Sequence, residues 1–376
     1  MKIHSTNTTT RRLLIASTVL FVASCSTIPA PDQNKDTVTP SQAESKRLVI
    51  AAVGDIMLDG SAREIMREQG YDYAFDKMRP WLQKADIAFG NLEGPLTDRG
   101  EPAPDKKYLF RSPPAKVADA LKAAGFDIVS LANNHSLDYG SEGLADTIAA
   151  LDKVGVHHVG AGENLGVARQ AAILQRNGLK VAFLAYSLTF PEEFWATAKR
   201  AGTVFGYREI VEGDIRAAKQ KADIVVASFH WGQESKTELR PYQVALGHAA
   251  IDAGASLVIG HHPHILQSVE RYKDGVILYS MGNFAFGSYS PNAKVSALAE
   301  IEFDGNKLTQ VRLQPINVFN IQVLFQPQPL VGQAAADVVD HLQQLSSMRE
   351  TRLVKVNDTA LLELPNTIHT ASNSNN

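Results

Sequence analysis

The sequence contains a single cysteine, Cys25, in 376 residues, so a fold held together by disulfide bonds within the chain is excluded. An excess of charge is also lacking, because 20% of the residues are charged and the formal net charge is only -3. No basic patch indicates a nucleic-acid partner. Beyond the N-terminal 25 residues, no apolar run is long enough to span a membrane. Hydrophobic residues make up 44% of the chain, which suffices for one large domain or two.

The N-terminal 25 residues have the pattern of a signal peptide. Arg11 and Arg12 form a positively charged start, residues 13–22 are apolar, and small residues precede Cys25. The apolar stretch is too short for a comfortable transmembrane helix. The segment Val22-Ala23-Ser24-Cys25 resembles the lipobox of bacterial lipoproteins, in which the cysteine becomes the lipid-carrying N-terminus. The sequence therefore predicts lipidation at Cys25, with an ordinary cleaved signal and an incidental cysteine as the alternative.

Lipidation would place the protein in the cell envelope, outside the cytoplasm, with the membrane as a partner. The residue after the cysteine is Ser26 rather than an aspartate. By resemblance to the sorting of lipoproteins in Gram-negative bacteria, this favours the outer membrane. Residues 26–46 are rich in Pro, Thr, Ser, Gln and Asp and lack the apolar content to pack. We expect them to form a flexible tether between the lipid and the folded part.

Apolar strand-like segments alternate with helical patterns between residue 47 and about residue 260, which predicts an α/β core. Helices are expected at 61–69, 114–124, 141–154, 212–221 and 241–253. After residue 275 the pattern changes to strands, and Asp304-Gly305-Asn306 predicts a hairpin turn, so the sheet should be mixed. We expect a main domain over 47–320 and an extension over 321–364, with an amphipathic helix at 333–348 and a last strand at 353–364. Residues 365–376 are polar and expected to be disordered.

The segment Gly260-His261-His262-Pro263-His264 follows an apolar run at 255–259 that predicts a buried strand. Imidazole is a common metal ligand, and Pro263 restricts the backbone between His262 and His264. Both side chains can therefore point into one crevice. The alternative is a solvated turn that happens to be rich in histidine.

Four other apolar runs end in the same way, with a carboxylate, amide or imidazole and a nearby glycine. In open α/β sheets, ligands bind outside the carboxyl ends of the strands. Five such ends therefore predict one site built from several strands. The four segments are Gly54-Asp55, Gly90-Asn91-Leu92-Glu93-Gly94, Asn133-Asn134-His135 and His230-Trp231-Gly232.

In their order along the chain, these segments resemble the motif series of CapA-type capsule-synthesis proteins. The series also includes Tyr279-Ser280-Met281-Gly282-Asn283-Phe284, and the resemblance covers roughly residues 47–320. That family is linked to the biosynthesis or export of poly-γ-glutamate and is related to the calcineurin-like metallophosphoesterases. The resemblance implies an α/β fold, with two mixed β-sheets forming a sandwich flanked by helices.

The resemblance also implies roles for single residues. His135, next to Asn134, would protonate a leaving oxygen. Asn283 would lie beside the site and contact substrate, unless it is simply a turn residue. Separately from the resemblance, Lys106, Lys107 and Arg111 lie in a Pro-rich loop after the second motif, where their charges suit a phosphate or the carboxylates of a polymer, unless the loop is simply solvated. The implied ligands of one or two divalent ions (Mn, Zn or Fe) are Asp55, Glu93, Asn134, His230, His262 and His264.

Two positions depart from the metallophosphoesterase pattern. The histidine expected two residues after Asp55 is Met57, and a thioether is a poor ligand for hard divalent ions. The bridging aspartate is replaced by either Asn91 or Glu93. One metal position therefore loses a ligand, and the count of one or two ions stays open.

Three functions are compatible with this pattern. The first is a lipid-anchored protein of capsular polymer biosynthesis or export that acts on an anionic polymer or a polymer–carrier linkage, together with other capsule-synthesis proteins. The second is a general metal-dependent phosphoesterase of the cell envelope. The third is a polymer-binding protein without catalytic turnover on the same fold.

Overall fold

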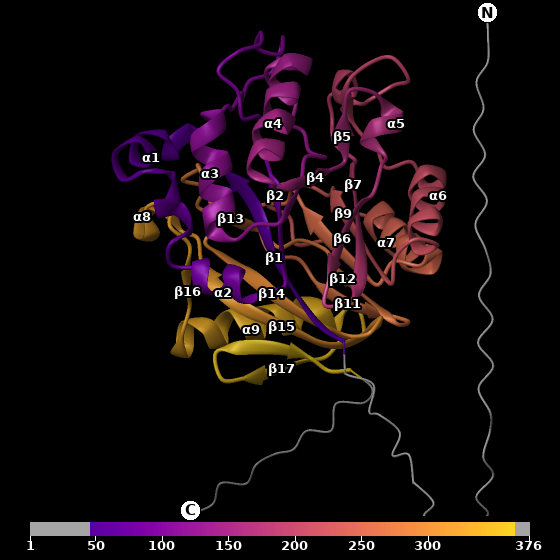
Figure 1. Ribbon diagram of the computed structural model, residues 1–376. Coiled ribbons are helices and arrows are strands. Elements are labelled where there is room, and N and C mark those ends of the chain that lie inside the picture. The colour runs from indigo at the N-terminus through magenta and orange to yellow at the C-terminus, as the bar shows by residue number, and fades with distance from the viewer. Residues whose placement is uncertain (1–45, 365–376) are drawn as a thin grey trace, which may run out of the picture. The chain divides into compact units, whose positions relative to one another are not determined.

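The computed structural model describes residues 46–364, so the predicted signal peptide, Cys25 and most of the tether lie outside the described residues. Two mixed β-sheets lie face to face between helices (Figure 1). The predicted sandwich of two mixed sheets flanked by helices is therefore confirmed. Among residues 46–364, no helix is both long and apolar enough to cross a membrane.

The larger sheet is built around the first strand of the domain. Parallel pairing joins β1 to β2, β2 to β3 and β3 to β4, whereas β14 pairs with β1 in the antiparallel direction. The strands, in spatial order, are β17 (Leu353–Val356), β18 (Thr359–Leu362), β15 (Lys307–Asn317), β14 (Val295–Asp304), β1 (Arg47–Met57), β2 (Ile87–Leu92), β3 (Ile128–Ser130) and β4 (His157–Val159). In addition, β13 (Asn283–Phe286) pairs with β1, and β16 (Gln328–Pro329) pairs with β15.

The second sheet has parallel strands at its centre, where β7, β9, β10 and β12 run in one direction. Its strands, in spatial order, are β11 (Val269–Tyr272), β12 (Gly275–Leu278), β10 (Leu257–His261), β9 (Ile224–His230), β7 (Leu179–Ser187) and β6 (Ala172–Arg176). A two-stranded ribbon of β5 (Ala161–Gly162) and β8 (Gly202–Thr203) completes the β-structure of the described residues.

Helices cover the outer face of each sheet (Figure 1). The larger sheet is flanked by α1 (Arg63–Gln69), α2 (Arg79–Lys84), α3 (Pro114–Ala124) and α4 (Gly140–Val154), and the second by α6 (Arg208–Lys219) and α7 (Pro241–Ala253). The shorter helices are α5 (Leu165–Ala168) and α8 (Asn320–Val323), with 3-10 turns at Gly60–Ala62, Tyr71–Phe75 and Glu192–Phe194.

The alternation of side chains along each central strand creates this layering. Ile50 and Ala52 of β1 lie in the core between the two sheets, whereas Ala51 and Val53 pack under the helices of the larger sheet. A strand that is buried on both faces reads as a continuous apolar run, which is what the sequence shows at residues 48–53.

The C-terminal extension belongs to the same sandwich. The helix α9 (Gly332–Ser347) packs with Val338, Val339 and Leu342 in the core between the sheets, on the apolar side that the sequence predicted. The last segment differs from the single strand expected at 353–364, because β17 and β18 form a hairpin. Asn357 has a φ of 52° and supplies the left-handed turn between them.

Two glycines next to the predicted donor residues allow the backbone of one strand to approach that of another. A Cβ on Gly54 would lie 1.9 Å from the carbonyl oxygen of Gly282, and one on Gly260 would lie 1.9 Å from that of Tyr279. Such distances are far inside van der Waals contact, so only glycine fits at either position. These residues bring Asp55 and His261 against neighbouring strands.

We expect Gly260→Ala to lower the free energy of unfolding by about 1–3 kcal/mol or more, because the methyl group must displace the backbone at Tyr279. Gly213→Ala is the matched control. Gly213 lies within α6 with nothing within 4 Å of the new Cβ, so the same change should stabilise the protein by about 0.5–1 kcal/mol. Urea unfolding curves of both variants test this, and an unchanged midpoint for Gly260→Ala would contradict it.

Candidate metal centre

The carboxyl ends of strands from both sheets meet at one place, and all six predicted donor residues lie there. Asp55 is at the end of β1, Glu93 directly follows β2, and Asn134 follows β3. His230 is the last residue of β9, and the turn with His262 and His264 follows β10. Parallel pairing of β1 with β2, and of β9 with β10, brings these ends together.

A first donor group consists of the buried side chains of Asp55, Glu93 and His230, whose ligand atoms lie within 4.8 Å of one another. His230 Nε2 is 3.9 Å from Glu93 Oε1 and 2.7 Å from Asn134 Oδ1. Asn134 therefore points into the same space. A separation of 3.9 Å is too long for a hydrogen bond and suits two ligands of one ion, each about 2 Å from it.

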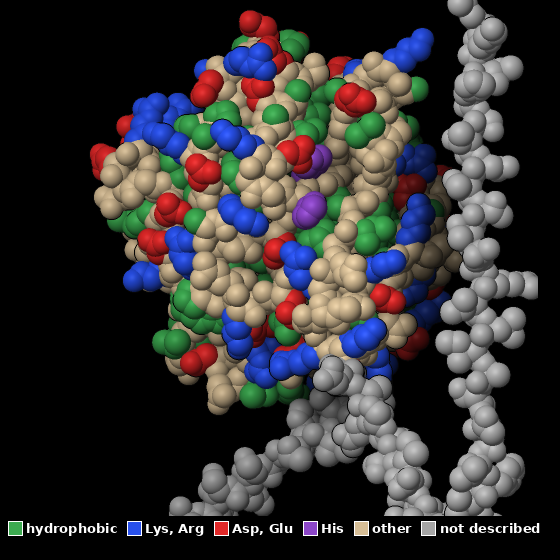
Figure 2. All heavy atoms as spheres, in the orientation of Figure 1, with side chains coloured by type: hydrophobic (Ala, Val, Ile, Leu, Met, Phe, Trp, Pro, Cys, Tyr) green, Lys and Arg blue, Asp and Glu red, His purple; other side chains and the backbone are tan. Residues whose placement is uncertain are grey.

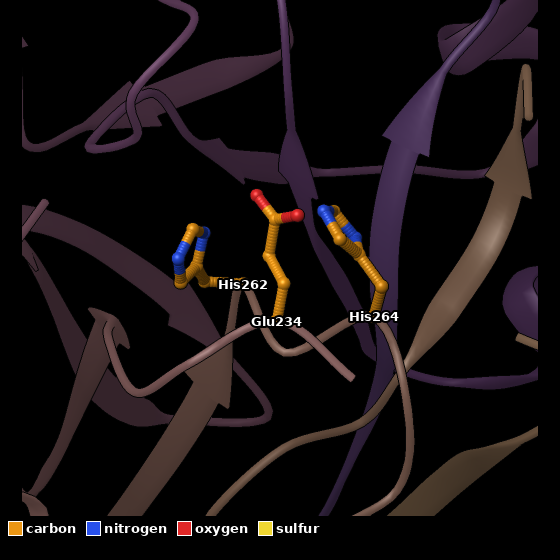
Figure 3. A group of neighbouring side chains, drawn as sticks. All are labelled: Glu234, His262 and His264. Atoms are coloured by element: carbon orange, nitrogen blue, oxygen red, sulfur yellow. The ribbon is translucent and has the colours of Figure 1, made fainter. Parts of the chain in front are cut away.

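A second donor group is formed by Glu234, His262 and His264, again with ligand atoms within 4.8 Å of one another. Figure 3 shows the Glu234 carboxylate between the two imidazole rings. Glu234 belongs to the loop after β9, and the backbone N–H of Ser235 donates to the carbonyl of Pro263 at 2.9 Å. This hydrogen bond ties the loop to the histidine turn.

The histidine turn has a strained backbone. His262 has a φ of 95° and His264 a φ of 59°, in the left-handed region that residues with a Cβ seldom adopt. Such conformations cost of order 1–3 kcal/mol each and concentrate at functional sites. Here the His264 imidazole lies 3.2 Å from Asp55 Oδ2, and the His262 ring lies 4.7 Å from the ring of His230.

Asn91 is oriented by a chain of hydrogen bonds. Asn133 Oδ1 accepts from the backbone N–H of His135 at 3.0 Å, so its amide nitrogen faces Asn91 and donates to Asn91 Oδ1 at 3.1 Å. Asn91 then presents its own nitrogen to the site and donates to Asp55 Oδ1 at 2.8 Å. An amide N–H is not a metal ligand, so this arrangement favours Glu93 over Asn91 as the donor.

Met57 belongs to neither donor group. Its sulfur accepts from the backbone N–H of Asp59 at 3.3 Å, and its side chain is buried. The position that a histidine occupies in metallophosphoesterases thus offers no ligand here. Glu234 was not predicted from the sequence, although a carboxylate three residues after His230-Trp231 is a readable signal.

The charges of the first group are balanced against one another. Burial opposes ionisation of Asp55, yet the adjacent imidazoles of His261 and His264 hold the pKa of Asp55 well below its usual range. Burial, and then the charge of Asp55, raise the pKa of Glu93 well above its usual range. Burial alone would lower the pKa of His264, but Glu93 and Asp55 raise it to about 9. Two carboxylates are thus buried together, an arrangement that a cation relieves.

The other two histidines are held in the form that binds metals. Burial, and then the charge of His262, hold the pKa of His230 well below its usual range. Burial and His264 lower the pKa of His262 to about 3. Both imidazoles are therefore neutral at neutral pH, with a lone pair free for coordination.

His135 lies beside this centre and is held by two partners. Its Nδ1 is 2.7 Å from Asp138 Oδ2 and 3.0 Å from Lys106 Nζ, and Lys106 also contacts Asp138 and the carbonyl of Asn134. Burial lowers the pKa of His135 and Lys106 adds to this, although Asp138 acts in the opposite direction. The ring of Phe110 covers the imidazole at 4.8 Å.

The residues predicted to contact substrate do not lie together. Asn283 Oδ1 lies 2.9 Å from His264 Nδ1, so Asn283 belongs to the centre. Lys107 is exposed and its ammonium lies over the ring of Tyr108, away from the donor groups, whereas its neighbour Lys106 reaches His135. Arg111 stacks on Tyr139 at 4.5 Å and lines a separate polar hollow with Arg63 and Arg67.

Two observations fit a divalent ion at this centre. Glu93 Oε1 and His262 Nδ1 are buried without a hydrogen-bond partner among the described residues. Buried polar atoms of this kind are costly unless something binds them. The donors are carboxylate oxygens and imidazole nitrogens, which suit Zn, Mn or Fe ions. Figure 2 shows histidine side chains at the surface near the middle of this face. Glu234 is exposed and His262 and His264 are partly exposed, so the second donor group is open to solvent.

The model of the family described as bacterial capsule synthesis protein PGA_cap matches residues 49–288. This chain belongs to that family. The resemblance to CapA-type proteins that the motif series predicted is therefore confirmed. The matched residues include every residue of both donor groups, from Asp55 to His264.

Two relatives have names that agree with the family. The capsule biosynthesis protein CapA of Bacillus anthracis is 36% identical over 293 residues, which cover 76% of this chain and 71% of that protein. The PGA biosynthesis protein CapA of Bacillus subtilis is 33% identical over 267 residues, covering 71% of this chain and 70% of that protein.

Among solved structures, the NAD nucleotidase of Haemophilus influenzae is similar, with a TM-score of 0.46 and 12% identity. The similarity covers 80% of this chain but only 56% of that protein. The chain therefore spans little more than half of that longer protein, and no functional conclusion comes from this likeness.

Proposed function

We propose that this chain is a metal-dependent hydrolase that cleaves a phosphoester linkage during the assembly of a capsular polymer. The observation that carries this proposal is the meeting of two donor groups at the strand ends. The first group is fully buried, and the second combines the exposed Glu234 with the partly buried His262 and His264. Asp55, Glu93, Asn134 and His230 would hold one ion. Glu234, His262 and His264 would hold another, with Glu234 in place of the ligand that Met57 does not provide.

A bound divalent ion would lower the pKa of a water ligand toward about 7 and offset the charge of a phosphoryl group. The residues around it supply the rest of the chemistry. Asp138 holds His135 through Nδ1, which leaves Nε2 as the atom that carries a proton to the leaving oxygen. Lys106 places a positive charge beside that imidazole and favours an anionic substrate.

An anionic polymer would gain a second contact at the hollow of about 290 Å³ that Arg63, Arg67 and Arg111 line. Arg63 is paired with Asp59 and Arg67 with Glu64, whereas the guanidinium of Arg111 has no carboxylate partner among the described residues. Arg111 is thus the residue that would hold a carboxylate or phosphate of the chain. Lipidation at Cys25 would keep the protein in the cell envelope, where such a polymer is assembled.

The two adjacent lysines provide a test of the proposal. Purified protein supplied with Mn, Zn or Fe ions should hydrolyse phosphomonoesters or phosphodiesters. Lys106→Met should lower the rate by about 10- to 100-fold, because it removes a partner that holds His135 and Asp138. Lys107→Met is the control and should keep the wild-type rate, since within residues 46–364 Lys107 interacts only with the exposed ring of Tyr108.

Thermal melting curves of both lysine variants show whether a lost rate reflects unfolding instead. Failure of the wild type on every phosphoester with every ion would contradict a hydrolase and favour a polymer-binding protein on this fold. A strain that lacks the gene yet keeps its surface polymer would contradict the role in capsule assembly.

A further inference from the structure

A hollow of about 440 Å³ opens directly on the candidate metal centre, because Asn134 and His262 form part of its wall. Its volume lies in the range of pockets that bind small molecules. None of its lining residues is Lys, Arg, Asp or Glu. A substrate whose phosphoryl group lies at the metal centre would place the group that is esterified to that phosphoryl in this hollow. The remaining wall is formed by Leu188, Thr189, Phe190, Phe205, Gly232 and Tyr242.

Phe190 and Phe205 of this wall belong to a row of four aromatic rings, and the other two, Trp195 and Tyr207, line a neighbouring hollow. The ring centroids of Phe190 and Trp195 are 5.6 Å apart, those of Trp195 and Phe205 3.9 Å, and those of Phe205 and Tyr207 4.7 Å. Phe190 is 68% exposed and Tyr207 is 52% exposed. Contiguous exposed apolar surface rimmed by polar residues marks binding sites, including ligand-binding grooves. We call these four residues the aromatic groove.

The aromatic groove is held in place by the strand that carries a metal donor. The backbone N–H of Leu188 donates to the carbonyl of His230 at 2.8 Å, and Trp195 Nε1 donates to the carbonyl of Thr189 at 2.9 Å. Arg200 Nη2 donates to the carbonyl of Trp195 at 2.9 Å. The rings therefore keep a fixed position relative to the centre, which lowers the entropic cost of binding.

The outer part of the aromatic groove disfavours a polyanion. A second hollow of about 350 Å³ shares Phe205 with the first and is also lined by Glu192, Glu193 and Arg200. The guanidinium of Arg200 donates to backbone carbonyls, so two carboxylates face this hollow against one cation that is already engaged. A chain of carboxylates would be repelled here, whereas hydroxyl groups would find acceptors.

We propose that the aromatic groove binds an uncharged sugar ring of the substrate, joined to the phosphoryl group that the metal centre holds. The faces of pyranose rings are apolar enough to stack on Phe190 and Phe205, and their hydroxyl groups reach Glu192 and Glu193 at the rim. This inference rests on the proposed hydrolase function and names its substrate class, a glycosyl phosphate. The groove selects the ring, and the donor groups hold the phosphate.

Two phosphonates that resist hydrolysis test the ring directly. Calorimetry on the Mn-loaded chain compares methylphosphonate, which lacks a ring, with the phosphonate analogue of glucose 1-phosphate. We expect the sugar compound to bind about tenfold tighter, and Phe190→Ala to remove this gain while methylphosphonate binds as before. Tyr289→Ala is the matched control, since Tyr289 is 47% exposed but lies in neither hollow, and it should change nothing.

Equal affinity for the two phosphonates, or a gain that survives Phe190→Ala, would overturn the sugar site. If neither phosphonate binds, the result contradicts the hydrolase function. Sugar binding in the aromatic groove is then tested separately with an uncharged probe. Saturation-transfer NMR with methyl glucoside should show contact in the wild type and its loss in Phe190→Ala, and no contact would overturn the inference. Tighter binding of adenosine than of methyl glucoside would replace the sugar with a nucleobase.

Discussion

Replacing His230 with alanine should remove the ion of the first donor group, about one of the two ions bound by the purified protein. His230 is the donor that faces both Glu93 and Asn134, and its imidazole is held neutral and ready for coordination. Removal of this direct ligand should weaken the affinity for the metal by at least about 100-fold. This loss exceeds that expected when a side chain that only orients a ligand is removed. Elemental analysis of wild type and variant measures the effect as ions per chain.

His157→Ala is the control for this experiment, because His157 is exposed on β4. It should retain the wild-type metal content. A wild type that holds no metal even after supplementation would contradict the metal centre itself. Metal content that is unchanged in His230→Ala would place the ions elsewhere.

The same measurement counts the ions. Two donor groups predict about two ions per wild-type chain. Glu234→Ala should leave about one, because Glu234 belongs only to the second group and Met57 offers no ligand to replace it. One ion per chain in both the wild type and Glu234→Ala would show that Glu234 does not replace the ligand that is missing at Met57.

Replacing His135 with alanine should lower the rate of hydrolysis by about 10²- to 10⁴-fold, the usual contribution of a positioned general acid. The imidazole lies next to Asn134 and is oriented by Asp138 at 2.7 Å, yet it belongs to neither donor group. The metal content of His135→Ala should therefore equal that of the wild type. Steady-state kinetics and elemental analysis on the same preparation separate the two effects.

Asp138→Asn provides a graded comparison for this prediction. It keeps the shape of the side chain but weakens the bond to His135 Nδ1, so the rate should fall less than in His135→Ala. A rate for His135→Ala within threefold of wild type would contradict the assigned role. A loss of bound metal in His135→Ala would instead show that His135 belongs to the metal-binding site.

The sequence predicted the donors because of where strands end. Asp55, His230 and His262 each follow or close an apolar run, and the carboxyl ends of parallel strands must meet at one edge of a sheet. That rule needs no knowledge of side-chain positions. The alternation of apolar runs and helical patterns predicted an α/β core with a mixed sheet, whereas the two-sheet sandwich was predicted by the resemblance to the CapA-type proteins.

The choice between Asn91 and Glu93 depended on the tertiary structure. Both residues follow the same strand, and the sequence left them as alternatives. Asn133, from the end of the next strand, fixes which end of the Asn91 amide faces the site. A hydrogen-bond chain between residues 42 positions apart cannot be read from either segment alone.

The sequence by itself determined the fold class, the family and the residues that meet at the strand ends, since these follow from local patterns repeated along the chain. Only the tertiary structure decided which lysine reaches His135, that Glu234 joins the histidine turn, and that two rings of the aromatic groove line the hollow beside the centre. The physical reason is the same in each case. Loops such as 97–113 and 188–207 have no periodic pattern, so which of their side chains turn inward is set by contacts with distant strands.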